Sequence, residues 1–365
     1  MRILEIIPQL SQGGAEKFVV DLTNQLSAQH DVLLVVLHSG DETSFFHKDI
    51  NPQVKVISLK KKSGMDISLF LKLNKLVKTF QPDVIHTHLR SILYILYAFI
   101  NNRRKCFIHT VHNDAQMEAG GFLGRMIRNL LFRFGVVPVT ISDNSQQSFR
   151  EFYNMSSELI YNGAAEYSTT GIFDDTYEEI SRIRTSPSSR LLLNVARISK
   201  QKNQLMLVDA IANLRKQGYD IELIIIGACE DELIQQQILS YKYDFIHVLG
   251  SRQNPRDYMK LSDAFCLSSI YEGMPISLIE CFSVGAIPVC TPVGGVNDMI
   301  IDGCNGILTS NIDENSIQEA ILRLLAMSDS ELQDMKRNSL LSFEKYSMNN
   351  CASQYECLMH RLLCR

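Results

Sequence analysis

The chain has 365 residues, of which 45% are hydrophobic and 21% are charged, with 19 Gly and 9 Pro. This length and composition exclude a disordered chain and a mini-protein held by disulfides, and they predict two domains that each bury a core. The formal net charge of −4 excludes a general electrostatic attraction to nucleic acid.

Short β-branched runs alternate with helix-length amphipathic segments along most of the chain, a pattern typical of α/β folds with parallel sheets. The strands predicted in the first half are Arg2–Ile7, Val32–Leu37, Val54–Leu59, Val84–His86, Phe107–Val111 and Val137–Ile141, with helices such as Ala15–Ala28 and Ser68–Phe80 between them. The alternation restarts with predicted strands at Leu191–Val195, Ile221–Ile226, Phe245–Leu249, Ala264–Leu267 and Ile287–Val289. Two similar α/β units are therefore expected.

The boundary between these units is predicted in a polar, acidic stretch that ends in the turn Ser186-Pro187-Ser188-Ser189. We expect a first domain at residues 1–165, a linker at 166–189 and a second domain at 190–345. The last fifty residues have a helical pattern, and we expect residues 346–365 to cross back to the first domain.

The two halves of the chain carry charge of opposite sign. Residues 1–163 hold 18 Lys and Arg against 14 Asp and Glu, whereas residues 164–365 hold 18 against 26. The basic residues of the first half gather at Lys60–Lys62, at Arg103–Lys105, and along Arg125, Arg128 and Arg133. Such clusters are usually a solvated surface, and contact with an anionic membrane or acceptor is the functional alternative.

The sequence predicts a cytoplasmic protein. Nine cysteines without a CxxC pair, most of them in apolar runs, indicate buried free thiols in a reducing compartment. The N-terminal apolar run carries Glu5 and lacks a cleavage site, so it predicts a strand and not a signal peptide. Because the longest apolar run, Ile92–Ile100, is far shorter than the roughly 20 residues of a membrane span, membrane contact is expected to be peripheral at most.

Candidate site residues should follow strands directly, because open parallel sheets bind ligands beyond the carboxyl ends of their strands. After the first strand, Gly13 and Gly14 open a helix and would let its N-terminus approach a phosphate, although a packing turn explains them equally well. His112 follows a later strand, where a structural histidine is the alternative. His86 and His88 end the preceding strand, but no carboxylate with metal-site spacing accompanies these histidines, so no metal is expected.

The second unit repeats this arrangement with charged residues. Arg197 and Lys202 follow its first strand, where two cations would suit a diphosphate, with ordinary loop charges as the alternative. Glu272 lies in a loop after another strand, and Glu280 lies inside an otherwise apolar helix. A carboxylate on an apolar face needs partners, and sugar hydroxyls are suitable ones. Gly294-Gly295 forms a second paired-glycine turn and candidate phosphate cradle.

Together, Gly13-Gly14-Ala15-Glu16, Arg197 with Lys202, Glu272-Gly273-Met274-Pro275 with Glu280, and Gly294-Gly295 resemble the motifs of glycosyltransferase family 4. The resemblance spans nearly the whole chain, and its most specific part is the Glu-x7-Glu element within Ser-x-x-x-Glu-Gly-x-Pro. It implies the GT-B fold, in which two Rossmann-like domains face each other across an interdomain cleft. It also implies a retaining transferase whose second domain binds a nucleotide-sugar donor and whose first domain binds the acceptor.

The resemblance implies a role for each matching residue. Arg197 and Lys202 would neutralise the donor diphosphate, and Glu280 would bind the ribose hydroxyls. Glu272 would hold donor-sugar hydroxyls, assisted by the segment Gly273, Met274, Pro275 and Ile276. His112 would contact the sugar near the reacting centre, and Gly13 and Gly14 would approach the phosphates. No Asp-x-Asp pair occurs, so neither a metal nor another cofactor is expected.

The expected function is sugar transfer to a glycan or a polyprenyl-diphosphate-linked acceptor in bacterial capsule or cell-surface polysaccharide synthesis. A nucleotide-sugar epimerase or a phosphorylase on the same scaffold is one alternative, and a non-catalytic sugar-nucleotide-binding protein is another. The Glu-x7-Glu element argues against the epimerase, and the absence of a pyridoxal-phosphate lysine signature argues against the phosphorylase. Donor sugar, nucleobase and acceptor depend on pocket shape, which motifs do not specify.

Overall fold

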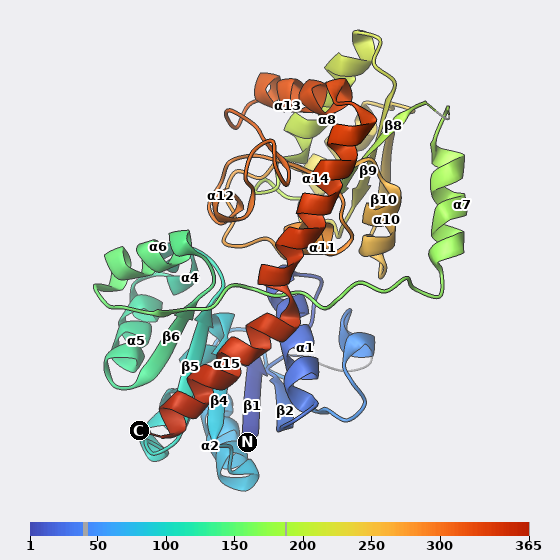
Figure 1. Ribbon diagram of the computed structural model, residues 1–365. Helices are drawn as coiled ribbons and strands as arrows, with labels where there is room; N and C mark the ends of the chain where they lie inside the picture. Colours follow the sequence, from blue (N-terminus) through green and yellow to red (C-terminus); the bar gives the residue numbers. More distant parts are fainter. Residues whose placement is uncertain (39–42, 187, 365) are drawn as a thin grey trace. The chain divides into compact units, whose positions relative to one another are not determined.

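A computed structural model describes residues 1–38, 43–186 and 188–364, so Pro187 of the predicted turn lies outside the described residues. The chain divides into two units (Figure 1). Unit 1 comprises Met1–Ala165 and Tyr346–Arg365, and unit 2 comprises Glu166–Lys345. Each unit is built on its own parallel sheet.

Unit 1 contains a parallel sheet in the order β3-β2-β1-β4-β5-β6-β7 among the described residues. Its strands are β1 (Arg2–Ile7), β2 (Asp31–Val36), β3 (Lys55–Ser58), β4 (Val84–His88), β5 (Cys106–Val111), β6 (Val136–Thr140) and β7 (Glu158–Leu159). Its α-helices are α1 (Gly14–Ser27), α2 (Ser68–Phe80), α3 (Leu96–Asn101), α4 (Ala115–Ala119), α5 (Phe122–Arg133), α6 (Asp143–Tyr153) and α15 (Met348–Leu363). The last helix thus belongs to the unit formed by the beginning of the chain.

Unit 2 contains a second parallel sheet, in the order β10-β9-β8-β11-β12-β13 in the described part. Its strands are β8 (Arg190–Val195), β9 (Ile221–Ile226), β10 (Ile246–Gly250), β11 (Ala264–Leu267), β12 (Pro288–Cys290) and β13 (Ile307–Leu308). Its α-helices are α7 (Phe173–Ile183), α8 (Gln204–Lys216), α9 (Glu232–Ser240), α10 (Pro255–Leu261), α11 (Ile276–Ser283), α12 (Val296–Met299), α13 (Glu314–Ala326) and α14 (Asp329–Ser342). The predicted α/β class with two parallel sheets is confirmed.

The structure differs from the sequence-based expectation in the predicted linker, which contains a helix. Helix α7 buries Thr176 and Ile180, and Asn254 before α10 donates a hydrogen bond from Nδ2 to Thr176 Oγ1 at 2.7 Å. Arg252 adds an ion pair to Glu179 at 3.0 Å. Part of the expected connection is therefore a packed element of unit 2.

Two further expectations about side chains are wrong. Arg128, placed by the sequence in a basic surface cluster, is 2% exposed and forms an ion pair with Glu118 at 3.0 Å. All nine cysteines are free, but only Cys266, Cys281, Cys290 and Cys351 are buried.

Among the described residues, no helix is both long and apolar enough to cross a bilayer.

The register of the central strands of unit 1 places polar residues side by side inside the sheet. Glu5 of β1 pairs with His86 of β4, and His88 pairs with Thr110 of β5. Since alternate residues of a strand share a face, His86 and His88 lie on one face with Glu5 and Thr110. All four side chains are fully buried. This face holds the site residues of unit 1 described below.

Candidate active site

In unit 2, a mostly buried ion pair joins two loops at the carboxyl ends of adjacent strands. Strands β8 and β11 pair directly, so the loops that follow them, 196–203 and 268–275, leave the same edge of the sheet. Lys202 of the first loop places Nζ 2.5 Å from Oε1 of Glu272 in the second loop. The two side chains are 14% and 6% exposed. The structure therefore brings together two of the predicted site residues.

Hydrogen bonds hold these loops against each other, and one more fixes the Glu272 carboxylate within its own loop. Ser269 Oγ donates to Glu272 Oε1 at 2.5 Å, and Ser268 Oγ donates to the Lys202 carbonyl at 2.9 Å. The Ile270 N–H donates to the Gln201 carbonyl at 2.8 Å, and Gln201 Nε2 donates to the Tyr271 carbonyl at 2.9 Å. Sequence reasoning did not select Ser269 or Gln201, although both lie beside residues that it did select. Among the described residues, no hydrogen bond given by the structure occupies the other Lys202 hydrogens or the second Glu272 oxygen, so these atoms can bind a ligand with phosphates and hydroxyls.

The Gly294-Gly295 turn packs against the backbone that carries Glu272. A Cβ on Gly294 would lie 1.9 Å from the Glu272 carbonyl oxygen, and one on Gly295 would lie 2.1 Å from that of Gly273. Gly294 also has a φ of +46°, which favours glycine. These glycines are thus required by close backbone approach, and their predicted role as a phosphate cradle stays a prediction.

This packing predicts that Gly294→Ala destabilises the protein by about 2 to 4 kcal/mol and lowers activity, because the Glu272 loop must move. Gly303→Ala is the matched control, since Gly303 has a φ of +75° but no atom within 4 Å of an added Cβ. We expect a loss of about 1 kcal/mol for the control. Thermal unfolding of both variants measures the difference, and equal losses would show that the close approach contributes nothing.

The segment that follows Glu272 leads into helix α11. Pro275 is the N-cap of this helix, and Met274 and Ile276 are 5% and 6% exposed. Glu280 lies one turn further along the helix and is 7% exposed. The structure thus places the backbone N–H groups at the start of α11 directly after Glu272, where they favour an anionic or hydroxyl ligand.

Arg197 has a different partner from Lys202. Its Nη1 lies 3.1 Å from Oε2 of Glu230, and the side chains are 41% and 51% exposed. Glu230 belongs to the segment after β9, which hydrogen-bonds to the loop of Arg197 through the Ile198 N–H and the Ala228 carbonyl at 2.8 Å. An exposed pair of this kind is weak, so a diphosphate could take the place of Glu230 on the guanidinium.

In unit 1, the side chain of Glu16 occupies the space beside Gly13. Gly13 is the N-cap of α1, and an added Cβ there would lie 2.3 Å from Glu16 Oε2. Ser11 Oγ donates to Glu16 Oε1 at 3.1 Å. A carboxylate at a helix N-terminus is favourable, so Glu16 itself explains part of the glycine requirement. Phosphate binding by Gly13 and Gly14 stays a prediction.

His112 directly follows β5 and is fixed at both its backbone and its ring. Its N–H donates to Glu118 Oε2 at 2.7 Å, and its Nε2 lies 3.0 Å from Nδ1 of His88. The ring of Phe18, from α1, packs edge-on with a centroid distance of 5.4 Å. Desolvation lowers the pKa of His112 to about 4, so the imidazole is neutral near pH 7.

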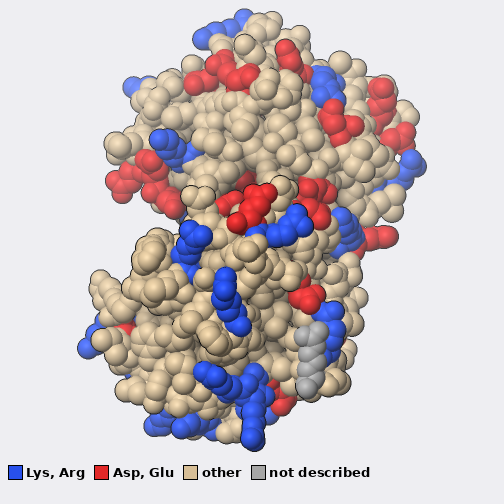
Figure 2. All heavy atoms as spheres, turned by 90° about the vertical axis from the view of Figure 1, so that its left-hand side faces the viewer, with Lys and Arg blue, Asp and Glu red and all other residues tan. Residues whose placement is uncertain are grey.

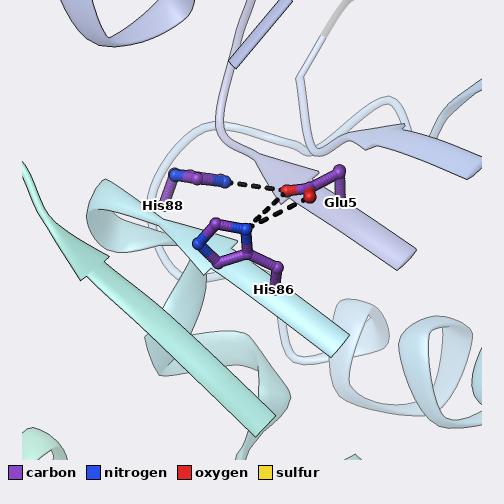
Figure 3. A group of neighbouring side chains, drawn as sticks. All are labelled: Glu5, His86 and His88. Atoms are coloured by element: carbon purple, nitrogen blue, oxygen red, sulfur yellow. Dashed lines mark hydrogen bonds and ion pairs between the residues drawn. The ribbon is translucent and has the colours of Figure 1, made fainter. Parts of the chain in front are cut away.

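The histidines of unit 1 have the carboxylate partner that the sequence analysis did not find. Glu5 accepts a hydrogen bond from His86 Nδ1 at 3.1 Å and one from His88 Nε2 at 2.9 Å (Figure 3). The partner was missed because it lies 81 residues from His86, on another strand. The feature of the sequence that could have indicated this partner is the presence of a charged residue, Glu5, inside an otherwise apolar strand. Glu118 was missed as well, since nothing in its local sequence links it to His112.

The predicted site residues thus form two sets, one within each unit. Lys202, Glu272 and the α11 N-terminus form the set of unit 2. In unit 1, His112 contacts helix α1 through Phe18, and no contact between His112 and Gly13 or Gly14 is given for the described residues. The expected cleft between the two sets stays a prediction.

Two family models match the two halves of the chain. The model described as Glycosyltransferase Family 4 matches residues 12–165, and the model described as Glycosyl transferases group 1 matches residues 176–340. The first match covers most of the N-terminal part of unit 1, and the second lies within unit 2. Together the matches account for both sets of site residues.

Individual proteins are similar along most of their length. An undecaprenol-diphosphate-glycan alpha-1,4-N-acetyl-D-galactosaminyltransferase of Campylobacter jejuni is 26% identical over 335 residues, which cover 88% of each chain. The capsular polysaccharide biosynthesis glycosyltransferase CapH of Staphylococcus aureus is 24% identical, over 87% of this chain and 83% of its own. The crystal structure of Anabaena HepE in complex with UDP-glucose has the same fold, with a TM-score of 0.82, 19% identity, and coverage of 99% of this chain and 100% of that one.

Proposed function

The chain belongs to glycosyltransferase family 4, and on this basis we propose that it moves a sugar from a nucleotide-diphosphate donor to a lipid-linked glycan with retention of anomeric configuration. The observation that carries the proposal is the mostly buried Lys202–Glu272 pair beside the start of α11. It combines a cation for the diphosphate with a carboxylate for sugar hydroxyls.

In the proposed reaction, the bond between the anomeric carbon and the donor diphosphate breaks, and a bond from that carbon to an acceptor hydroxyl oxygen forms. The electron pair of the broken bond stays on the diphosphate, and the acceptor proton passes to a diphosphate oxygen on the same face of the sugar. Charge therefore develops on the leaving group. Lys202, Arg197 and the α11 N-terminus stabilise this charge from fixed positions.

The carboxylates of unit 2 position the donor. Glu272 accepts hydrogen bonds from sugar hydroxyls, while Lys202 and Ser269 hold its side chain in place. Glu280 binds the ribose hydroxyls from the next turn of α11. Neither carboxylate attacks the sugar, because in this scheme the departing diphosphate supplies the base.

The acceptor class is inferred from the relatives. The name of the Campylobacter jejuni relative gives an undecaprenol-diphosphate-linked glycan as acceptor, and the name of the Staphylococcus aureus relative gives capsular polysaccharide biosynthesis. We extend this chemistry to the present chain, with unit 1 binding the acceptor. Family membership favours this function over the epimerase and over the non-catalytic binding protein.

The test is a donor screen. The purified protein is incubated with a panel of nucleotide sugars, with UDP-glucose and UDP-N-acetylgalactosamine among the first, and with a synthetic polyprenyl-diphosphate saccharide. Mass spectrometry of the acceptor is expected to show a gain of one sugar with one donor of the panel. Absence of a mass gain with every donor and every acceptor tried would overturn the proposal.

We further propose that transfer needs no divalent metal, because Lys202, Arg197 and helix N-termini supply the positive charge at the diphosphate. Excess EDTA is therefore expected to leave the transfer rate within about twofold of its value in added Mg²⁺ or Mn²⁺. A loss of activity in EDTA that added metal restores would show that the diphosphate charge is stabilised by a metal.

A surface of unit 1 suits docking on an anionic bilayer, and we propose that the protein associates with one. Helix α5 exposes the apolar side chains Phe122, Leu123, Met126 and Leu130, which are 84%, 52%, 52% and 47% exposed. Arg125 and Arg133 lie on the same helix. An exposed helix face of large apolar residues with interspersed arginines is typical of interfacial binding.

The charges of the first unit support this docking surface. Figure 2 shows basic side chains gathered on the surface of unit 1. Within the cluster Lys60–Lys62, Lys61 Nζ donates to the carbonyls of Lys62 and Gly64 at 3.0 and 2.5 Å, whereas Lys60 and Lys62 are exposed. The apolar face of α5 is therefore the sharper target for mutation.

Replacing Phe122 and Leu123 by Ser is expected to weaken co-sedimentation with phosphatidylglycerol vesicles at least tenfold, because each side chain loses its transfer into the interface. Leu233→Ser in unit 2 is the control, since Leu233 is 78% exposed and lies far along the chain on α9. Equal binding of all variants, or equal binding to vesicles of neutral phosphatidylcholine, would contradict this docking surface.

A further inference from the structure

Six side chains of unit 1 form one continuous chain of hydrogen bonds with Glu5 at its centre. One branch runs from Glu5 through His88 to His112, and the other runs through His86 and Thr110 to Tyr355 of α15. All of them except His112 are fully buried. The family resemblance implies a role for His112 alone among these six residues, so the other five residues have no assigned role.

The strand register builds the first branch. His88 places Nε2 2.9 Å from Glu5 Oε2, and its other nitrogen, Nδ1, lies 3.0 Å from His112 Nε2. Figure 3 shows the rings of His86 and His88 directed at the Glu5 carboxylate from the neighbouring strand. Both nitrogens of His88 are therefore engaged.

The second branch fixes the other side of the carboxylate. His86 places Nδ1 3.1 Å from Glu5 and Nε2 2.8 Å from Thr110 Oγ1, which lies 2.7 Å from the Tyr355 hydroxyl. The Tyr355 ring also packs on His86 at a centroid distance of 5.0 Å. The C-terminal helix thus closes the far end of the chain of hydrogen bonds.

The charge states of Glu5 and His88 set the direction of the bonds on the first branch. Burial of Glu5 opposes ionisation, but the attraction of His86 and the hydrogen bonds from His86 and His88 outweigh it and lower the pKa of Glu5 to about 2. Burial likewise lowers the pKa of His88 well below its usual value. At neutral pH an ionised Glu5 can only accept hydrogen bonds, and a neutral His88 has one N–H.

These constraints leave one arrangement of protons on the first branch. His88 must carry its hydrogen on Nε2, because that nitrogen donates to Glu5, so Nδ1 is a bare acceptor. The only hydrogen that can fill the 3.0 Å contact then lies on Nε2 of His112. A neutral His112 consequently has a bare Nδ1, which accepts no hydrogen bond from the residues that the structure describes.

We infer that Glu5 and His88 are positioning residues that hold His112 in the Nε2–H tautomer, so that its Nδ1 is presented as a hydrogen-bond acceptor for a sugar hydroxyl. The hydroxyl-binding part rests on the proposed function, together with the contact between His112 and the donor sugar that the family resemblance implies. A histidine free to switch tautomer would present a donor for part of the time. Glu5 and His88 thus determine that Nδ1 of His112 is a hydrogen-bond acceptor and not a donor.

The same residues could also serve as metal ligands, since Glu5, His86 and His88 offer one carboxylate oxygen and two ring nitrogens within 4.8 Å of one another. The distances of 2.9 and 3.1 Å between the nitrogens and the carboxylate are those of hydrogen bonds. A bound metal would require both nitrogens that face Glu5 to lose their hydrogens. Metal content is therefore one of the measured outcomes.

The direct test is the tautomer of His112 in the full-length protein. Long-range ¹H–¹⁵N correlation spectra of ¹⁵N-histidine-labelled protein at pH 7, assigned with His112→Phe, are expected to show a neutral ring protonated on Nε2. In His88→Phe the tautomers of His112 should become mixed. A wild-type His112 that is protonated on Nδ1 or charged, or a stoichiometric metal in the purified protein, would overturn the inference. This test needs no transferase activity, so it stays decisive if the proposed function fails.

Kinetics separate positioning from general damage. His88→Phe is expected to lower kcat roughly 10- to 100-fold with little change in KM for the donor. Because His88 acts through His112, the double variant with His112→Phe should be no slower than His112→Phe alone. His247→Phe in unit 2 is the matched control, since His247 also bonds a fully buried glutamate, Glu222, at 3.0 Å and should keep full activity. If the fold-losses in kcat of the two single variants multiply in the double variant, the inference is contradicted. Glu5→Gln provides a second variant if His88→Phe does not fold.

Discussion

Lys202→Ala is expected to lower kcat/KM by about 1,000-fold, which corresponds to about 4 kcal/mol of lost transition-state stabilisation. The variant removes the mostly buried cation that lies 2.5 Å from Glu272. Among the described residues, the nearly buried carboxylate then keeps Ser269 as its side-chain partner. The unpaired charge should also repel the donor diphosphate. Both effects act on the leaving group, so kcat should fall more than KM rises.

Lys200→Ala is the control for this result. Lys200 lies in the same loop but is exposed, so its removal should change kcat/KM by less than twofold. Arg197→Ala should lie between the two variants, with a loss of about 10- to 100-fold, because Arg197 is more exposed and is paired with Glu230. Steady-state rates of nucleoside-diphosphate release measure all three. Equal activity of the Lys202 and Lys200 variants would show that Lys202 is not part of the active site.

Unit 1 is expected to lose stability as the pH falls below about 6.5. Burial lowers the pKa of both His109 and His112 from 6.5 to about 4 in the folded protein. Between these two values the unfolded chain binds protons that the folded unit does not bind, so acidification favours unfolding. The fully buried His109 alone corresponds to about 3 kcal/mol at pH 4.

Two carboxylates extend this loss to lower pH. Burial opposes ionisation of Glu5 and Glu118, but their histidine partners, and Arg128 beside Glu118, outweigh burial and lower both pKa values from 4.5 to about 2. Their contribution is present above pH 4.5 and is lost as the pH falls towards 2. The stability of unit 1 should therefore fall in two successive windows.

Hydrogen exchange at several pH values, corrected for the intrinsic exchange rate, distinguishes the two units. Amides of β1, β4 and β5 should lose protection between pH 6.5 and 4, whereas those of β8 and β9 should lose less. His109→Gln should reduce the loss of protection between pH 6.5 and 4, because it removes one of the groups that titrate in this range. Uniform loss of protection in both units would mean that the buried histidines do not govern the acid response.

The regular elements could be predicted because their hydrophobic patterns are local. The predicted bounds Arg2–Ile7, Ile221–Ile226 and Ala264–Leu267 match β1, β9 and β11, because buried parallel strands are mostly apolar runs. The edge strands β7 and β13 were not predicted, because two residues carry no pattern. Helix α7 was not predicted because most of its residues are acidic or polar, and its buried face consists only of Thr176 and Ile180.

The site could be predicted only as far as short motifs reach. Lys202, Glu272 and the start of α11 lie in segments whose residue types and spacing indicate their chemistry, and the structure brings Lys202 and Glu272 into contact. The partners that fix these residues come from elsewhere in the sequence. Glu230 pairs with Arg197, and Glu5 lies 83 residues from His88. Such pairings depend on strand order and register, which a single sequence does not encode locally.

The most direct test of sugar transfer measures both products in one reaction. With the donor identified by the screen and a polyprenyl-diphosphate saccharide, mass spectrometry and nucleotide analysis should find one nucleoside diphosphate released for each sugar added to the acceptor. The new linkage should have the same anomeric configuration as the donor, and Glu272→Ala should abolish both products together. Nucleoside diphosphate released without sugar on the acceptor, or an undiminished yield from Glu272→Ala, would contradict the assignment of this chain as a transferase that uses the Lys202–Glu272 site.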